Sequence, residues 1–218
     1  MKKVVLSLVV VAGLVFTTTS CKKSENAGEA TEVASESAEA VKYTVDTNAS
    51  VIEWKGSKVV SGAHNGTLKL ASGEVSAKEG AIEAGNFGID MNTIEVLDLV
   101  DDAEKKGWLE GHLKGLGEDN ADHFFNTTEF PEAKFEITSV SEGSIEGNLT
   151  IKGITKNVKF PAAVTVSDNE LVIASEIFTI NRTEWNVNYG SGNVFKNLAA
   201  DNVISDDIEL KVLVKATK

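Results

Sequence analysis

Residues 207–216 read DIELKVLVKA, and this stretch decides the fold. Its apolar and charged residues alternate, and the apolar members are Ile208, Leu210, Val212 and Val214. Because successive side chains of a strand point to opposite faces, the alternation predicts a strand with one buried face and one wet face. Sheets that keep one face wet are typically antiparallel. The stretch therefore predicts an antiparallel β-sheet protein.

The same alternation recurs along most of the chain beyond residue 41. The segments that show it are 43–46, 51–60, 65–70, 82–91, 133–140, 144–152, 156–166 and 170–180. Pairs typical of turns punctuate them, namely Asn65-Gly66, Ser72-Gly73, Glu79-Gly80, Glu142-Gly143 and Asp168-Asn169. Eight or nine consecutive strands with short turns indicate an up-and-down sheet, which loses its exposed edges when it closes into a barrel. A two-sheet sandwich fits the same alternation.

Residues 97–125 interrupt the strands. Apolar residues and one histidine recur there at helical spacing, at Trp108, Leu109, His112, Leu113 and Leu116. The acids before them, Asp101, Asp102 and Glu104, suit the first turn of a helix. Glycines at 107, 111 and 115 leave one side of this helix bare, which predicts a close approach to a barrel wall. We interpret WLEGHLKGLGEDNADHFF (residues 108–125) as a short helical and looped insertion that forms a rim and lid.

The first twenty residues, MKKVVLSLVVVAGLVFTTTS, predict a signal peptide. Two lysines precede an apolar run, Val4–Phe16, that is too short to span a bilayer comfortably. Cys21 follows and is the only cysteine of the chain, so an internal disulfide is excluded. Its place at the end of a signal peptide resembles a bacterial lipobox, which predicts lipid modification of Cys21 and a membrane anchor. An ordinary signal peptide followed by an incidental cysteine is the alternative.

Residues 21–40 have no aromatic side chain and are rich in Glu, Ser and Ala. Such a composition buries too little apolar surface to offset the entropy of ordering, so it predicts a flexible acidic tether. A short amphipathic helix is the alternative, because Ala and Glu are good helix formers. Residues 41–218 then form a single domain that is large enough for one substantial core.

Charge and motifs exclude several classes of function. The formal net charge is −12, so binding of nucleic acid through phosphate neutralisation is not expected. The chain has no G-x-S-x-G nucleophile motif, no P-loop and no dinucleotide-binding fingerprint. No catalytic residue and no cofactor are predicted, and the protein is interpreted as a binder rather than an enzyme.

The three histidines, His64, His112 and His123, leave a metal-dependent hydrolase open as an alternative. None of them sits in an H-x-H or H-E-x-x-H motif, so a metal site is not the preferred interpretation. His64 and His123 suit hydrogen bonds within a barrel rim or exposure to water. His112 lies beside Leu113 on the apolar side of the insertion, which favours a polar contact at a pocket mouth.

Arg182 is the only arginine among 21 basic residues. It follows the apolar alternation of residues 177–180, which predicts a buried or half-buried guanidinium. A buried cation needs a partner, and a planar guanidinium suits a carboxylate or pyrophosphate. Two readings stay open, an internal salt bridge with Asp90 or Glu184 and a contact with a ligand.

Taken in order, these segments resemble the YceI-like family of lipocalin-like, polyisoprenoid-binding proteins. The resemblance rests on YTVD (43–46), SVIEW (50–54), HNG (64–66), GNFGIDM (85–91), LEGHLK (109–114), the pair Phe124-Phe125, FPEAKF (130–135), GNLTIKG (147–153), FTINR (178–182) and Trp185. It covers essentially the whole domain. Two positions depart from the family pattern, since residues 115–123 form a longer link than usual and Asn126 replaces the acid that commonly follows the double phenylalanine.

The resemblance implies an antiparallel lipocalin-like barrel of about eight strands around a long apolar pocket. It also implies an exported binder of a quinone or polyprenyl compound, held non-covalently, and it makes a homodimer plausible. The expected location is the outer membrane, with the domain facing the periplasm or the cell surface. A structural envelope module with a filled barrel is a further alternative. The residues expected to contact the ligand are Arg182, His112, His64 and Asp90 at its polar head and Trp54, Phe87, Phe124, Phe125 and Phe178 along its tail.

Overall fold

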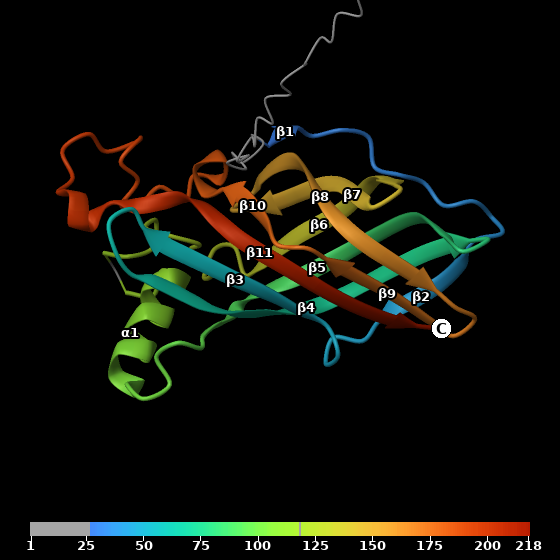
Figure 1. Cartoon of the computed structure of the whole chain (residues 1–218), viewed down its shortest axis with the longest axis horizontal. Coiled ribbons are helices and arrows are strands. Elements are labelled where there is room, and N and C mark those ends of the chain that lie inside the picture. The colour runs from blue at the N-terminus through green and yellow to red at the C-terminus, as the bar shows by residue number, and fades with distance from the viewer. Residues whose placement is uncertain (1–26, 118) are drawn as a thin grey trace, which may run out of the picture.

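The computed structural model describes residues 27–117 and 119–218 (Figure 1). The predicted signal peptide and Cys21 lie outside these residues. The described elements, in chain order, are β1 (Gly28–Glu29), β2 (Val41–Val45), β3 (Val51–Lys58), β4 (Ala63–Lys78), β5 (Ala81–Val96), α1 (Ala103–Lys114), β6 (Glu132–Ser141), β7 (Ser144–Ile151), β8 (Ile154–Val166), β9 (Glu170–Ser175), β10 (Phe178–Asn181), the 3-10 helices η1 (Arg182–Trp185) and η2 (Ala200–Asn202), and β11 (Ile204–Thr217). None of the helices in these ranges is long and apolar enough to cross a membrane.

The strands form one closed antiparallel ring. From β3 to β9 each strand pairs with the next along the chain, and β11 pairs with β9 and β10 on one side and with β2 and β3 on the other. If β2 and β3 are counted as one interrupted strand, and β9 and β10 as another, the ring has about eight strands. This closure confirms the predicted barrel, because a sandwich would leave two separate sheets.

β11 lies as its alternation predicts. The apolar side chains of DIELKVLVKA line the interior, and Val214 is almost fully buried, while Lys211 is exposed. Val212 of β11 pairs with Ile52 of β3, so an inward-facing side chain of β3 lies beside it. The period of two therefore assigns the inner and outer faces of this strand correctly.

β4 is longer than the sequence predicts, because the turns expected at Asn65-Gly66 and Ser72-Gly73 are wrong. Both pairs lie inside β4, whose pairing with β5 shifts register near them, so the alternation is broken without ending the strand. Gly66 is required for packing, since a Cβ there would lie 1.8 Å from the carbonyl oxygen of Glu95. The turn at Glu79-Gly80 is confirmed, and both of its residues have positive φ.

The predicted helix in the insertion is α1, Ala103–Lys114. The side chain of Asp102 caps its N-terminus by accepting a hydrogen bond from the backbone N–H of Lys105 at 3.0 Å. The expectation that the glycine side faces the barrel is wrong, because nothing lies within 4 Å of a Cβ built at Gly107 or Gly111. Gly115 instead ends the helix in the left-handed conformation.

The flexible tether predicted for residues 21–40 is wrong for its described part, Ala27–Ala40. This segment, here called the strap, lies along the outside of the barrel, and β1 pairs with β8 (Figure 1). Asn148 binds the backbone of Thr31 twice, donating to its carbonyl at 2.7 Å and accepting from its N–H at 3.0 Å. The backbone N–H of Ala34 donates to the carbonyl of Ile137. The strap is thus held by hydrogen bonds. A prediction that considers only the apolar content of the segment overlooks them.

Replacing Asn148 by alanine is expected to release the strap. The change removes both bonds to Thr31 and leaves the nearby amide of Asn157 with fewer partners, at a cost of about 1–3 kcal/mol. Hydrogen exchange of residues 27–40 should become fast, while that of β4 and β5 stays slow. Asn169→Ala, in the turn between β8 and β9, serves as the control. Unchanged protection of the strap in Asn148→Ala would show that other contacts hold it.

Candidate functional site

The barrel is hollow. It encloses a cavity of about 1010 Å³, at the upper end of the range of roughly 300–1,000 Å³ for small-molecule pockets. We call the open end of this cavity, formed by the β3–β4 turn, α1 and residues 187–203, the mouth (Figure 1). The filled barrel of the structural-module alternative is therefore not what the chain forms.

The cavity wall is aromatic and aliphatic. All five aromatic residues expected along a ligand tail line it, namely Trp54, Phe87, Phe124, Phe125 and Phe178. Phe178 stacks on Phe160 with 4.5 Å between the ring centroids, and Phe160 contacts Phe135 in turn. These rings form a continuous apolar surface on one wall.

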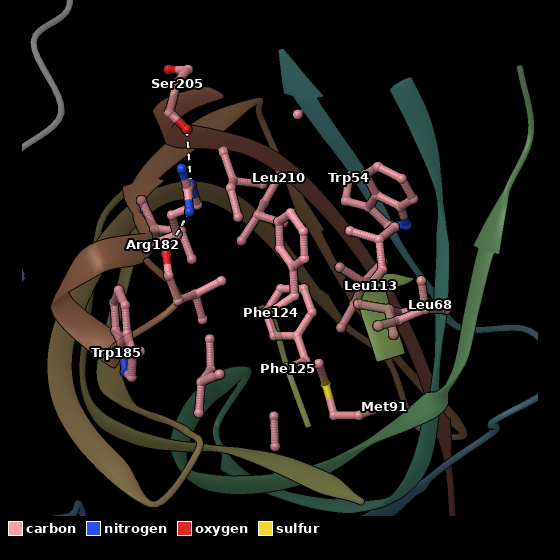
Figure 2. Close-up of a pocket in the computed structure, with 18 of the residues that line it drawn as sticks. Trp54, Leu68, Met91, Leu113, Phe124, Phe125, Arg182, Trp185, Ser205 and Leu210 are labelled. Carbon is pink, nitrogen blue, oxygen red and sulfur yellow. Dashed lines mark hydrogen bonds between the residues drawn. The ribbon is translucent and has the colours of Figure 1, made fainter. Parts of the chain in front are cut away.

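The insertion closes part of the mouth. Phe124 and Phe125 lie between the wall that carries Arg182 and Trp185 and the wall that carries Trp54 (Figure 2). The backbone N–H of Phe125 donates to the carbonyl of Leu113 at 3.1 Å, which fastens the phenylalanine pair to the end of α1. Because Leu109 and Leu113 also line the cavity, the insertion acts as the rim and lid that the sequence predicts.

His112 is the buried polar residue of this lid. Its Nε2 lies 2.9 Å from Nδ1 of His123, and both rings contact the ring of Tyr189. Burial, and then the nearby charge of His123, lower the pKa of His112 from its ordinary value of 6.5. A neutral His112 can share one proton with His123, which a doubly protonated pair could not do.

His64 lies elsewhere on the rim and is bound to Asp98, with 2.7 Å between Nδ1 and Oδ2. Of the described side chains, no three from His, Cys, Asp and Glu come together as a metal-binding group. The donor set that the three-histidine hydrolase requires is thus not assembled by these residues.

Acidification is expected to destabilise the protein through His112. Unfolded His112 takes up a proton as the pH falls through about 6.5, whereas folded His112 resists protonation. Its contribution to stability is therefore complete above that pH and is lost as the pH falls through the lowered pKa. Urea midpoints measured from pH 7.5 to 5.5 should fall in the wild type and fall less in His112→Gln. Equal slopes in the two proteins would contradict the assignment.

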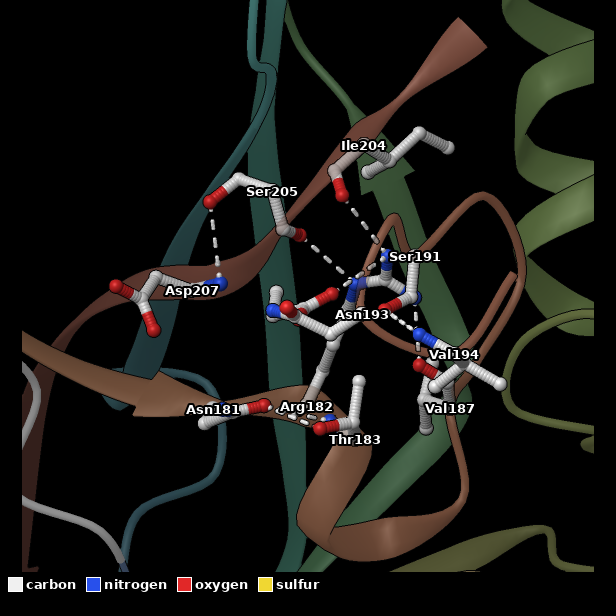
Figure 3. Close-up of polar contacts among 11 residues, drawn as sticks. Asn181, Arg182, Thr183, Val187, Ser191, Asn193, Val194, Ile204, Ser205 and Asp207 are labelled. Atoms are coloured by element: carbon white, nitrogen blue, oxygen red, sulfur yellow. Dashed lines mark hydrogen bonds and ion pairs between the residues drawn. The ribbon is translucent and has the colours of Figure 1, made fainter. Parts of the chain in front are cut away.

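Arg182 is buried at the mouth end of the cavity, with 3% of its surface exposed. Its guanidinium donates to the carbonyls of Ser205 at 2.9 Å, Val187 at 2.5 Å and Ile204 at 3.3 Å (Figure 3). Nη2 also lies 3.7 Å from Oδ1 of Asp206. Burial lowers the pKa of Arg182, and Asp206 partly offsets this change. The predicted internal partners, Asp90 and Glu184, are wrong, because the carboxylate that faces Arg182 belongs to Asp206.

Eight of the nine residues expected to contact a ligand line the cavity, and Asp90 does not. Asp90 lies in β5, where its carboxylate accepts a hydrogen bond from the backbone N–H of Asn92. Tyr189 and Phe195 line the mouth and were not predicted, because the segment 187–203 has no periodic pattern. The run Asn188-Tyr189-Gly190, an aromatic residue between turn formers, is the one signal that could have indicated Tyr189.

A comparison with protein-family models decides the family. The model of the YceI-like domain matches residues 43–216. The chain belongs to the YceI-like family. This YceI-like chain is also 33% identical over 86 residues to UPF0312 proteins of Staphylococcus aureus, a stretch that covers 37% of this chain and 47% of the relative. The match thus spans about half the length of these curated relatives.

Solved structures share the YceI-like fold. BcnA of Burkholderia cenocepacia aligns with a TM-score of 0.58 and 20% identity, over 79% of this chain and 99% of BcnA. A polyisoprenoid binding domain from Saccharophagus degradans, implicated in plant cell wall breakdown, aligns with a TM-score of 0.54 and 16% identity, over 80% and 97% of the two chains. At these identities the likeness supports the lipocalin-like barrel alone.

Proposed function

We propose that this YceI-like protein binds and carries an isoprenoid-type amphiphile, such as a quinone or a polyprenyl compound, inside its barrel. The observation that carries the proposal is the apolar cavity of about 1010 Å³ inside the barrel, which opens at the mouth. The relative from Saccharophagus degradans, described as a polyisoprenoid binding domain, has the same fold and supports this class of ligand. The role is binding rather than catalysis, since the cavity wall is apolar over most of its length.

The polar groups of the cavity set the orientation of the ligand. They gather toward the mouth, where Arg182, Ser205, His112 and His123 lie, whereas side chains deeper in the barrel, such as Ile173, are apolar. The tail therefore occupies the depth of the barrel and the polar head stays near Arg182 and His112. The guanidinium has more N–H donors than its three carbonyl bonds use, so it can donate to an oxygen of the head.

The cavity wall supplies enough free energy for binding without many polar contacts. Burial of about ten methylenes contributes roughly 8 kcal/mol before the cost of association. This corresponds to a dissociation constant in the micromolar range. The affinity for a prenyl chain therefore depends mainly on the length of the tail that is buried, and the head group adds selectivity.

The proposed site of action is the cell envelope. The predicted signal peptide and lipobox support an outer-membrane anchor at Cys21, with the domain facing the periplasm or the cell surface. Mass spectrometry of the intact protein tests this part, because acylation adds a defined mass at Cys21 and Cys21→Ser abolishes it. An unmodified Cys21 in protein made by a lipoprotein-processing bacterium would refute the anchor.

Mass spectrometry of an organic extract tests the proposed ligand. Protein purified without detergent should yield a prenyl compound in an amount close to one per chain, and delipidated protein should take up a prenyl quinone. Protein that is consistently lipid-free and takes up no prenyl compound would refute the carrier function.

A further inference from the structure

Exposed apolar side chains concentrate at the mouth. Nine of the twelve large apolar side chains exposed among residues 27–117 and 119–218 lie on three segments there. Two are in the β3–β4 turn (Val59 and Val60), four lie between residues 97 and 116, and three lie between residues 189 and 195. These three segments lie at the same end of the barrel, on the left in Figure 1. We call this set the apolar rim.

The apolar rim continues into the cavity. Trp108, Tyr189 and Phe195 belong to the rim and also line the cavity, and Trp108 is 67% exposed. A water-facing tryptophan and tyrosine are unusual on a soluble surface but favourable at the level of lipid head groups. An apolar ligand that leaves the cavity therefore crosses an apolar surface and not a polar one.

The strap holds the N-terminal side of the chain near the same end. Ala27 packs against the cluster that contains Phe124, Trp185 and Val187. Six peptide bonds join Cys21 to Ala27, and a chain of that length spans at most about 20 Å. An anchor at Cys21 would thus keep the mouth close to the membrane.

The charge around the apolar rim determines which type of bilayer this surface can approach. Exposed acids outnumber exposed lysines among the described residues of 57–63, 97–125 and 187–203, and the whole chain carries a formal charge of −12. The acids are Asp98, Asp101, Glu104, Asp119, Asp122 and Asp201, and the lysines are Lys58, Lys105 and Lys196. An anionic bilayer would repel this surface, whereas a zwitterionic one would not.

We propose that the apolar rim docks on a zwitterionic lipid bilayer, so that the ligand passes between bilayer and cavity without entering water. The inference rests on the proposed function, because it assigns a lipid partner to the same cavity. It goes beyond that function by naming the surface through which exchange occurs.

The test uses the full chain and phosphatidylcholine vesicles loaded with a prenyl quinone. The variant Val59→Asp/Val60→Asp charges the rim at two exposed residues that do not line the cavity. Val33→Asp/Val41→Asp is the matched control, since it adds the same charge at exposed valines away from the mouth. Two readouts are the rate of quinone uptake from vesicles and the rate of uptake from detergent solution. The third is the quenching of Trp108 fluorescence by brominated phosphatidylcholine, and the variant Trp108→Phe shows which part of the fluorescence comes from Trp108.

The rim variant is expected to take up quinone from vesicles about tenfold more slowly, with uptake from detergent unchanged, since two aliphatic side chains are lost from the apolar contact. Quenching of Trp108 should fall in parallel, and phosphatidylglycerol in the vesicles should slow the wild type. Equal vesicle rates in the rim variant and the control would overturn the docking proposal while uptake from detergent upholds the carrier function. Loss of dimerisation in the rim variant, without a change of vesicle rate, would assign the rim to a second copy of the chain. Failure of the wild type to take up quinone from either source would overturn both proposals.

Discussion

Replacing Leu68 and Leu210 together by tryptophan is expected to abolish binding of a prenyl quinone and to change the free energy of unfolding by less than about 1 kcal/mol. Both side chains line the cavity, from β4 and β11, the two strands that flank β3 (Figure 2). In a packed core such enlargement is destabilising by about 1–3 kcal/mol, because side chains and backbone must shift. In a hollow barrel the indoles occupy space that a lipid tail would otherwise fill. Quinone titration and urea denaturation of the same samples measure the two effects.

The matched control for this experiment is Lys69→Trp/Lys211→Trp. These exposed residues are the outward neighbours on the same two strands, so the control adds the same side chains outside the barrel. It should bind quinone as the wild type does. Strong destabilisation of the inward variant, or unchanged quinone binding by it, would contradict a lipid-accepting cavity.

Replacing Arg182 by alanine is expected to lower the free energy of unfolding by about 3–5 kcal/mol, even without ligand. The change removes the donor from the carbonyls of Val187, Ile204 and Ser205 and leaves the carboxylate of Asp206 without its facing cation. Because these carbonyls lie on the segment after η1 and at the start of β11, the mouth should loosen first. Urea denaturation gives the free energy, and hydrogen exchange of residues 187–206 gives the local effect.

Two further variants separate charge from geometry at this position. Arg182→Lys keeps the charge but cannot reach three carbonyls in a planar fork, so it should lose an intermediate amount of stability. Arg182→Met combined with Asp206→Asn should regain part of the loss, because the unpaired charge is gone. If Arg182→Ala unfolds at the wild-type urea concentration and only quinone binding suffers, the guanidinium is a ligand contact and not a structural clamp.

The alternation of apolar residues was sufficient to predict the barrel. It assigns one inner face and one outer face to each strand, and for β11 these are the faces that the structure shows. It was not sufficient to predict strand length. Ser72-Gly73 has the composition of a turn, and only the register shifts of β4 against β5 show that the strand continues. Gly66 is likewise fixed by contacts with Trp54 and Glu95, which lie far from it in the sequence.

The apolar wall of the site could be predicted, and its polar partners could not. Aromatic residues within alternating strands must point inward or outward, so Phe87 and Phe178 could be assigned to the interior from the sequence. The partner of Arg182 could not be assigned, because three of its acceptors are backbone carbonyls, which every residue carries. The strap was missed for a related reason, since its contact with Asn148 uses backbone atoms of Thr31.

The pairing of β11 with β3 has a consequence for how the molecule is made. Glu53 and Lys211 are partners in the ring, yet 158 positions separate them along the chain. Closing so large a loop is entropically costly, and topologies rich in such distant pairs fold slowly. A ribosome that has synthesised β3 must add all the intervening strands before the ring can shut, so the nascent chain stays open for a long interval. Until then the edge of β3 that pairs with β11 stays unpaired, and an unpaired strand edge favours aggregation of the unfinished chain.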